Sequence, residues 1–209
     1  MSPERVAWCE KPADQSEVGT TNKQTNHWQA DVDSDIEASM VPTKGRRMPN
    51  WTQNILTVTG KDYDGSKGTW RDFGTRTKGV VDEGGTFLEH YIPRDPRVGK
   101  DIEMANGFVV NTYATMQEDG FDGYQWCLDN WGCKWPENDC EIDIRERSVR
   151  LSFVTPWDAP IAGLVHISDL FQLAKFRLVS DYEGCDDIIR RKFQAGKLLA
   201  TEWVAGGPA

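Results

Sequence analysis

Residues 140–154, CEIDIRERSVRLSFV, decide the fold class of this chain. Apolar and polar side chains alternate over residues 140–145 and again over 149–154, which is the period of strands with one buried face. The intervening residues 146–148 are few enough to form a tight turn. The sequence therefore predicts an antiparallel β-hairpin at this point in the chain.

The residues that follow this hairpin predict a helix, a strand and a second hairpin. Asp158-Ala159-Pro160 is typical of a helix start, and apolar residues recur at helical spacing from Ile161 to Ala174. Residues 176–182, FRLVSDY, predict another strand. Residues 188–193 and 197–204, on either side of Ala195-Gly196, predict a final hairpin.

The residues that precede residue 140 show a weaker pattern. Residues 54–59, NILTVT, are rich in β-branched side chains and predict a strand that ends at Gly60. Residues 61–86 are rich in glycine and charge, which indicates a long loop or a poorly formed helix. Residues 86–92 predict a second short strand, ended by Pro93, and Asp122 is placed to cap a short helix that runs to Asn130.

The order of these elements predicts the fold class. The predicted elements are, in chain order, a strand, an irregular crossover with a helix, a β-hairpin, a helix and a strand. Together they form a βαββαβ series. That series implies an α+β, ferredoxin-like fold, in which an antiparallel sheet carries two helices on one face. The C-terminal hairpin is an addition to this plan.

Composition divides the chain into two parts. Residues 1–47 are polar and lack an apolar period, so they cannot bury enough apolar surface to offset the entropy of ordering them. We therefore expect residues 1–47 to form a flexible N-terminal extension and residues 48–209 to form the domain.

Charge and hydropathy exclude several classes of protein. The 209 residues include 24 Lys and Arg against 33 Asp and Glu, a net charge of −9, which argues against nonspecific nucleic-acid binding. No run of 18 apolar residues predicts a membrane span, and the first 25 residues contain no apolar stretch of the kind found in secretory signals. We therefore expect a cytoplasmic protein that does not bind membranes.

The cysteines give no indication of a metal site. Five cysteines form an odd number, in a chain without a signal peptide, and are expected to be reduced thiols. Cys127, Cys133 and Cys140 follow no common zinc spacing. We expect neither a metal nor a cofactor.

Three ordered motifs resemble a known family. They are Met48-Pro49-Asn50-Trp51, Trp131-Gly132-Cys133-Lys134-Trp135 and Phe153-Val154-Thr155-Pro156-Trp157. Together they resemble the YubB-type ferredoxin-like domain proteins of bacteriophages, conjugative plasmids and other mobile elements, over residues 48–183. The chain departs from that family at Cys133 and Pro156 and in its tail. The resemblance implies an accessory protein of a phage or mobile element.

The tryptophans of these motifs are the candidate site. Trp51, Trp131, Trp135 and Trp157 fall at the ends of elements or in loops bounded by Gly and Pro. In one interpretation they cover the open end of the sheet, with Lys134 stacked on an indole. In the other they line a concave aromatic pocket that binds a nucleotide-like ligand. The residues predicted to bind that ligand are Asn50, Trp51, Asn54, Trp131, Lys134, Trp135 and Trp157.

The motifs of common hydrolases are missing from the sequence. There is no Gly-x-Ser-x-Gly and no His-Glu-x-x-His, so we predict no catalytic residues and favour a non-enzymatic protein. One hypothesis is an accessory protein that binds a nucleotide-like small molecule, which leaves open a role against host defence. A second is an acidic module that binds a host or phage protein or forms a homodimer. The third, an enzyme of unknown chemistry, is the least favoured.

Overall fold

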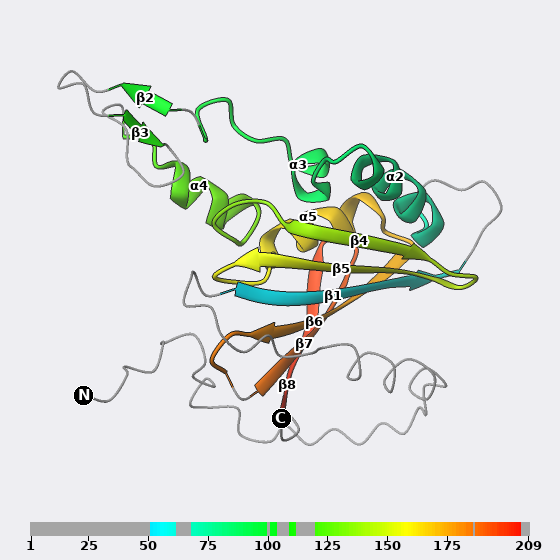
Figure 1. The fold of residues 1–209 in the computed structure, drawn as a ribbon. Helices are drawn as coiled ribbons and strands as arrows, with labels where there is room; N and C mark the ends of the chain where they lie inside the picture. Colours follow the sequence, from blue (N-terminus) through cyan, green and yellow to red (C-terminus); the bar gives the residue numbers. More distant parts are fainter. Residues whose placement is uncertain are drawn as a thin grey trace. The chain divides into compact units, whose positions relative to one another are not determined.

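The computed structural model describes residues 51–61, 68–99, 101–103, 109–111, 120–185 and 187–205 (Figure 1). The predicted extension, residues 1–47, and the candidate site residue Asn50 lie outside the described residues.

A six-stranded antiparallel sheet forms the centre of the fold, in the order β4-β5-β1-β6-β7-β8. Its strands are β1 (Trp51–Gly60), β4 (Asn138–Ile144), β5 (Ser148–Pro156), β6 (Ala174–Tyr182), β7 (Asp187–Gln194) and β8 (Lys197–Ala205). A separate two-stranded sheet pairs β2 (Asp101–Glu103) with β3 (Val109–Asn111).

Four helices occur in the described part of the chain: α2 (Trp70–Asp82), α3 (Phe87–Tyr91), α4 (Gly123–Asn130) and α5 (Ile161–Leu170). Figure 1 shows α2, α3 and α5 on the same face of the large sheet. Helix α2 packs against β4 and β5, and α5 packs against β6, β7 and β8. Two helices begin at side-chain caps, because the Thr69 hydroxyl accepts the Asp72 N–H and the Asp122 carboxylate accepts the N–H groups of Tyr124 and Gln125.

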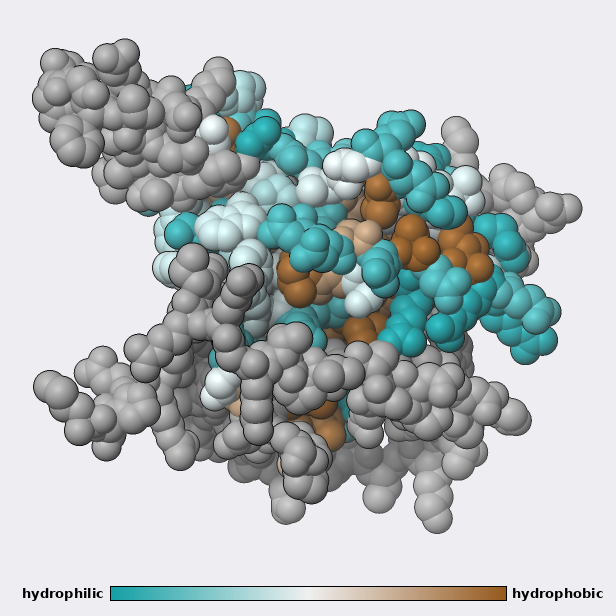
Figure 2. All heavy atoms as spheres, in the orientation of Figure 1, coloured by the Kyte–Doolittle hydropathy of each residue, from teal (hydrophilic) through white to brown (hydrophobic). Residues whose placement is uncertain are grey.

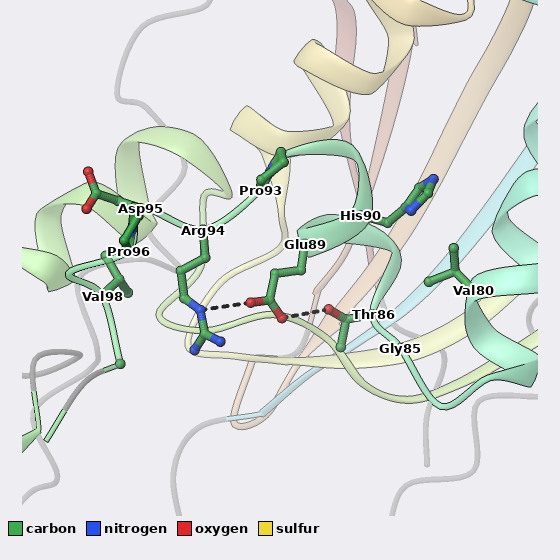
Figure 3. Close-up of a pocket in the computed structure, with 11 residues that line it drawn as sticks. Val80, Gly85, Thr86, Glu89, His90, Pro93, Arg94, Asp95, Pro96 and Val98 are labelled. Carbon is green, nitrogen blue, oxygen red and sulfur yellow. Dashed lines mark hydrogen bonds and ion pairs between the residues drawn. The ribbon is translucent and has the colours of Figure 1, made fainter.

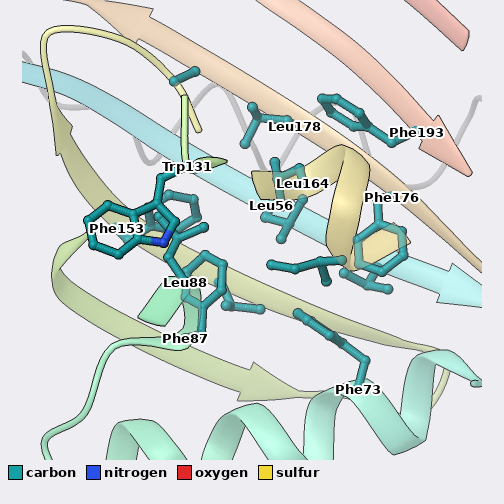
Figure 4. Close-up of a cluster of buried hydrophobic side chains, with 14 of the residues drawn as sticks. Leu56, Phe73, Phe87, Leu88, Trp131, Phe153, Leu164, Phe176, Leu178 and Phe193 are labelled. Carbon is teal, nitrogen blue, oxygen red and sulfur yellow. The ribbon is translucent and has the colours of Figure 1, made fainter. Parts of the chain in front are cut away.

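The hydrophobic core fills the space between the sheet and these helices (Figure 4). Strand alternation places Leu56 and Val58 of β1 on the covered face, where they are fully buried. The largest fully buried side chains in this core are Trp70, Phe73, Phe87, Trp131, Phe176 and Phe193. Aromatic rings therefore supply much of the buried apolar area, and three of them, Phe73, Phe171 and Phe176, make edge-to-face contacts.

The predicted fold class is wrong, because the sheet is larger than that of a βαββαβ ferredoxin-like fold. The C-terminal hairpin was expected as an addition to a smaller sheet. Instead, β7 pairs with β6 along the register Phe176↔Phe193 to Asp181↔Ile188, and β8 pairs with β7. The result is one continuous sheet of six strands, and the described residues form four helices rather than two.

Individual elements were predicted with mixed success. The strand ending at Gly60, the hairpin around residues 146–148, the helix after Pro160, the strand over residues 176–182 and the final hairpin are confirmed, with shifts of a few residues at their ends. The strand predicted over residues 86–92 is wrong, because residues 87–91 form α3. Of the two alternatives for residues 61–86, a long loop or a poorly formed helix, the structure favours a helix, since thirteen of these residues form the regular helix α2.

Within the described ranges, Cys127, Cys133 and Cys140 are free thiols, and burial raises the pKa of each. Cys185 differs from the expectation of reduced thiols, since it is disulfide-bonded.

The described surface visible in Figure 2 is mostly hydrophilic, with patches of hydrophobic side chains between the polar ones. No helix in the described ranges is both long and apolar enough to cross a membrane.

Candidate functional site

Three tryptophans predicted for the site belong to neighbouring segments at one end of the sheet. Trp51 begins β1, and its register partner Pro156 on β5 immediately precedes Trp157. The indole of Trp51 makes an edge contact with that of Trp135, at 6.2 Å between ring centroids. Trp157 makes a similar contact with Tyr124 of α4, at 5.9 Å. We call Trp51, Tyr124, Trp135 and Trp157, together with Lys134, the aromatic end.

Lys134 links two of these rings. Its Nζ lies 4.6 Å from the ring centroid of Trp157 and 5.2 Å from that of Trp135, so one ammonium group is close to two indoles. Such cation–π contacts are worth about 0.5–2 kcal/mol each, and the larger value applies where water is excluded. Lys134 and all four aromatic side chains are half-buried, so these groups remain partly accessible to solvent.

The backbone at Trp157 adopts an uncommon conformation. Its φ is +75°, and the Asp158 N–H donates a hydrogen bond to the Pro156 carbonyl at 3.0 Å. A hydrogen bond across three residues with a positive φ at the middle one is the geometry of a γ-turn, which is rare and strained. Strain of this kind persists only where surrounding contacts enforce it, so the position of Trp157 is set by the fold.

Hydrogen bonds that the Asp158 carboxylate accepts hold this turn against the sheet. Its Oδ1 accepts the Tyr182 hydroxyl at 2.6 Å and the Ala159 N–H at 2.7 Å. The Arg191 Nη1 in turn donates to the Tyr182 hydroxyl at 3.2 Å. Burial, followed by the nearby Asp158 carboxylate, raises the pKa of Tyr182 well above its usual value, so this hydroxyl remains a donor.

Asn54 is buried and joins the three central strands. Its Nδ2 donates to the Thr155 Oγ1 of β5 at 2.8 Å and to the Thr52 carbonyl at 3.0 Å. Its Oδ1 accepts the Ser180 hydroxyl of β6 at 2.9 Å. Both polar atoms of the amide are therefore engaged within the protein, so Asn54 is not available to a ligand in this conformation.

Trp131 is also part of the interior. Its side chain is fully buried, and its Nε1 donates to the Ile92 carbonyl at 3.1 Å. The ring packs edge to face on Trp126, at 5.1 Å between centroids. A ligand therefore cannot reach this indole. Of the predicted residues, the structure brings together Trp51, Lys134, Trp135 and Trp157.

Tyr124 belongs to the aromatic end but was not among the predicted residues. The only sequence signal for it was its place on the predicted helix that begins at Asp122, where it shares a face with Cys127. That pattern indicates core packing and not a surface contact with Trp157, 33 positions further along the chain.

A cavity of about 610 Å³ lies elsewhere, beside α3 and the turns that follow it (Figure 3). Within it the Arg94 Nε and the Glu89 Oε1 form an ion pair at 2.8 Å, and the Thr86 hydroxyl donates to the Glu89 Oε2 at 3.3 Å. This cavity could not be predicted from the sequence, because its wall includes a segment for which a strand is predicted. Glu89 and Arg94 pair with each other, and Asp95 and His90 also line the cavity.

No three His, Cys, Asp or Glu side chains of the described part of the chain lie close enough together to hold a metal ion.

Comparison with known proteins adds one structural similarity. No family model matches the sequence, and no curated protein matches it. The crystal structure of protein api92 from Yersinia pseudotuberculosis, described by the family model DUF1281, aligns with a TM-score of 0.44 and 9% sequence identity. The alignment covers 78% of this chain and 100% of that chain. No role is transferred from that protein to this one.

Proposed function

We propose that this chain is a non-enzymatic binding protein whose aromatic end takes a small nucleotide-like ligand. The observation that carries the proposal is the position of the Lys134 ammonium group, 4.6 and 5.2 Å from two half-buried indoles. A planar base can stack on an indole while a phosphate contacts the ammonium, so this group of side chains suits both halves of a nucleotide.

The energies involved correspond at most to a weak complex. Stacking of one base on an aromatic side chain is worth about 1–3 kcal/mol, and a hydrogen bond to a charged group contributes about 1.5–3 kcal/mol. On binding, Lys134 exchanges its contact with the indoles for one with phosphate. The indole face that it leaves then becomes available to the base.

The setting of this activity rests on the sequence motifs. The resemblance to YubB-type proteins supports an accessory role in the cytoplasm of a bacterium that carries a phage or plasmid, where sequestering a nucleotide-like molecule would counter a host defence.

The experiment is a calorimetric titration of the full chain with the four ribonucleoside monophosphates and with ATP. We expect saturable binding, and we expect Lys134→Met to weaken it at least tenfold, because methionine keeps the apolar stem and removes the charge. Lys78→Met is the matched control, since Lys78 is exposed on α2 and pairs only with Asp82 there. The proposal fails if no nucleotide binds at millimolar concentration, or if both variants bind like the wild type.

A second pair of variants tests the stacking. Trp157→Gly removes the indole but suits the positive φ of this position, so the turn is expected to survive. Ala195→Gly, at φ +46° in the turn between β7 and β8, is the control for the backbone change. We expect binding to be lost in the first variant and kept in the second, with circular dichroism confirming that both fold. Unchanged affinity in Trp157→Gly would rule out a stacking role for this ring.

A further inference from the structure

The edge of the sheet at β8 is exposed and long. β8 is the last strand in the sheet order and contains nine residues, of which 197–202 are all exposed (Figure 1). Leu198 and Leu199 are 43% and 59% exposed. A strand at such an edge presents backbone N–H and C=O groups to any chain that can pair with it, and natural proteins usually protect it with charge or proline.

The two edges of the sheet differ in how they are protected. At the opposite edge, β4 carries three exposed acids, Asp139, Glu141 and Asp143, and no base. Two copies of β4 side by side would therefore place like charges together, which is destabilising. β8 contains one base, Lys197, and one acid, Glu202, and no proline. Charge thus discourages self-association at β4 but not at β8.

We propose that β8 pairs antiparallel with β8 of a second copy of this chain, about a two-fold axis at Thr201. In that register all nine residues have a partner. Leu198 lies opposite Val204, and Leu199 lies opposite Trp203, each pair occurring twice. This proposal is independent of the nucleotide-binding proposal, because it involves none of the residues of the aromatic end.

The charges on β8 also fit this register. Lys197 lies opposite Ala205 and Glu202 lies opposite Ala200, so no like charges face each other. Apolar cross-strand pairs and a Thr–Thr pair at the axis each stabilise this pairing. A register centred on Ala200 would instead place Leu198 opposite Glu202 and leave Val204 and Ala205 unpaired, which makes it the weaker arrangement.

The contact area of a single strand pair is small for a stable dimer. A bulge at the start of β8 limits it further, because the register with β7 passes from Lys192↔Ala200 to Phe193↔Leu198 and leaves Leu199 as the extra residue. We therefore expect a dimer that forms and dissociates with protein concentration.

Sedimentation of the full chain over a range of concentrations tests the association. We expect the mass to rise from 23.7 kDa towards twice that value. Leu199→Lys should raise the dissociation constant at least tenfold by placing charge in the pairing. Leu173→Lys is the matched control, since Leu173 is 45% exposed but lies between α5 and β6, with its backbone beside Gly60 of β1. A wild type that stays monomeric, or a control that loses the dimer while Leu199→Lys keeps it, would overturn the proposal.

Cross-linking tests the register. A cysteine at residue 201 lies opposite itself across the axis, so Thr201→Cys should form a disulfide-linked dimer on mild oxidation. Lys197→Cys places the two thiols at opposite ends of the paired strands and should not cross-link. Linkage of the second variant without the first would contradict the proposed pairing. Because neither experiment includes a nucleotide, its failure would leave the binding proposal for the aromatic end intact.

Discussion

The carboxyl group of Glu137 accepts the backbone N–H of Leu88 at 3.3 Å, across 49 positions of sequence. It also accepts the N–H of Phe87, the first residue of α3. The cap residue of this helix, Thr86, makes no side-chain cap hydrogen bond, so a distant acid supplies what the local sequence does not. Glu137 therefore fixes α3 to the segment that leads into β4.

The first prediction concerns the pH dependence of stability. Burial of Glu137 raises its pKa from 4.5 to about 8. Between these two values the native state keeps a proton that the unfolded chain loses, so the free energy of unfolding falls as the pH rises through this window. We expect the fall that Glu137 causes to amount to roughly 2–4 kcal/mol between pH 5 and pH 8, measured by urea denaturation.

Glu137→Gln isolates this effect, because a neutral side chain of the same shape cannot ionise. Its free energy of unfolding should depend less steeply on pH than that of the wild type over the same range. Glu141→Gln, on an exposed position of β4, should behave like the wild type. Equal slopes in all three proteins would mean that Glu137 does not titrate in this window.

The second prediction compares two glycines of α2. A Cβ added at Gly74 would overlap the Cγ2 of Val149, whereas one added at Gly79 meets nothing within 4 Å. Alanine is favoured over glycine in a helix by about 0.8–1.0 kcal/mol. We therefore expect Gly79→Ala to stabilise the protein by about that amount. Gly74→Ala should destabilise it by about 1–2 kcal/mol, since overpacking exceeds the helical gain.

The cause of the loss at Gly74 can be checked by making the same change beside a smaller neighbour. In a Val149→Ala background the obstructing methyl groups are gone, and Gly74→Ala should become neutral or stabilising there. Chemical denaturation of the four proteins gives the coupling between the two positions, and a coupling near zero would show that the overlap is relieved in another way.

The third prediction concerns Trp131. Its indole is fully buried and its Nε1 donates to the Ile92 carbonyl, so Trp131→Ala should cost about 3–5 kcal/mol of unfolding free energy. Trp131→Phe should cost less, because it keeps most of the packed ring and loses the hydrogen bond. Thermal and urea unfolding measure both. A near-neutral Trp131→Ala would contradict the assignment of this residue to the core.

The sequence predicted best where a single face of a strand or helix is buried. Residues 140–154 form a hairpin because alternation over two short runs leaves few other ways to bury Ile142, Leu151 and Phe153. Helix α2 could not be told from a loop for the opposite reason. Its buried positions are Trp70, Phe73, Gly74 and Thr77, so two of the four are not apolar and the helical stripe is hidden.

The remaining errors depend on contacts between distant segments. Residues 86–92 contain a short apolar run that suits a strand as well as a helix, and the acid that fixes it as α3 is some fifty residues away. The final hairpin was visible, but which edge it would join was not, so the six-stranded sheet could not be foreseen. Likewise, Trp131 and Trp135 occur in one motif, and only tertiary packing separates a core residue from a surface one.

The γ-turn at Trp157 has a consequence for recognition. A surface indole on an ordinary flexible loop samples many orientations, and a ligand that binds it must restrict them at an entropic cost to affinity. Here the backbone torsion at φ +75° and the hydrogen bonds of Asp158 fix the backbone that carries the ring, and Tyr124 and Lys134 pack on the ring itself. The Trp157 ring is thus held in place before binding, so a ligand bound as proposed above would displace Lys134 but leave this ring close to its original orientation.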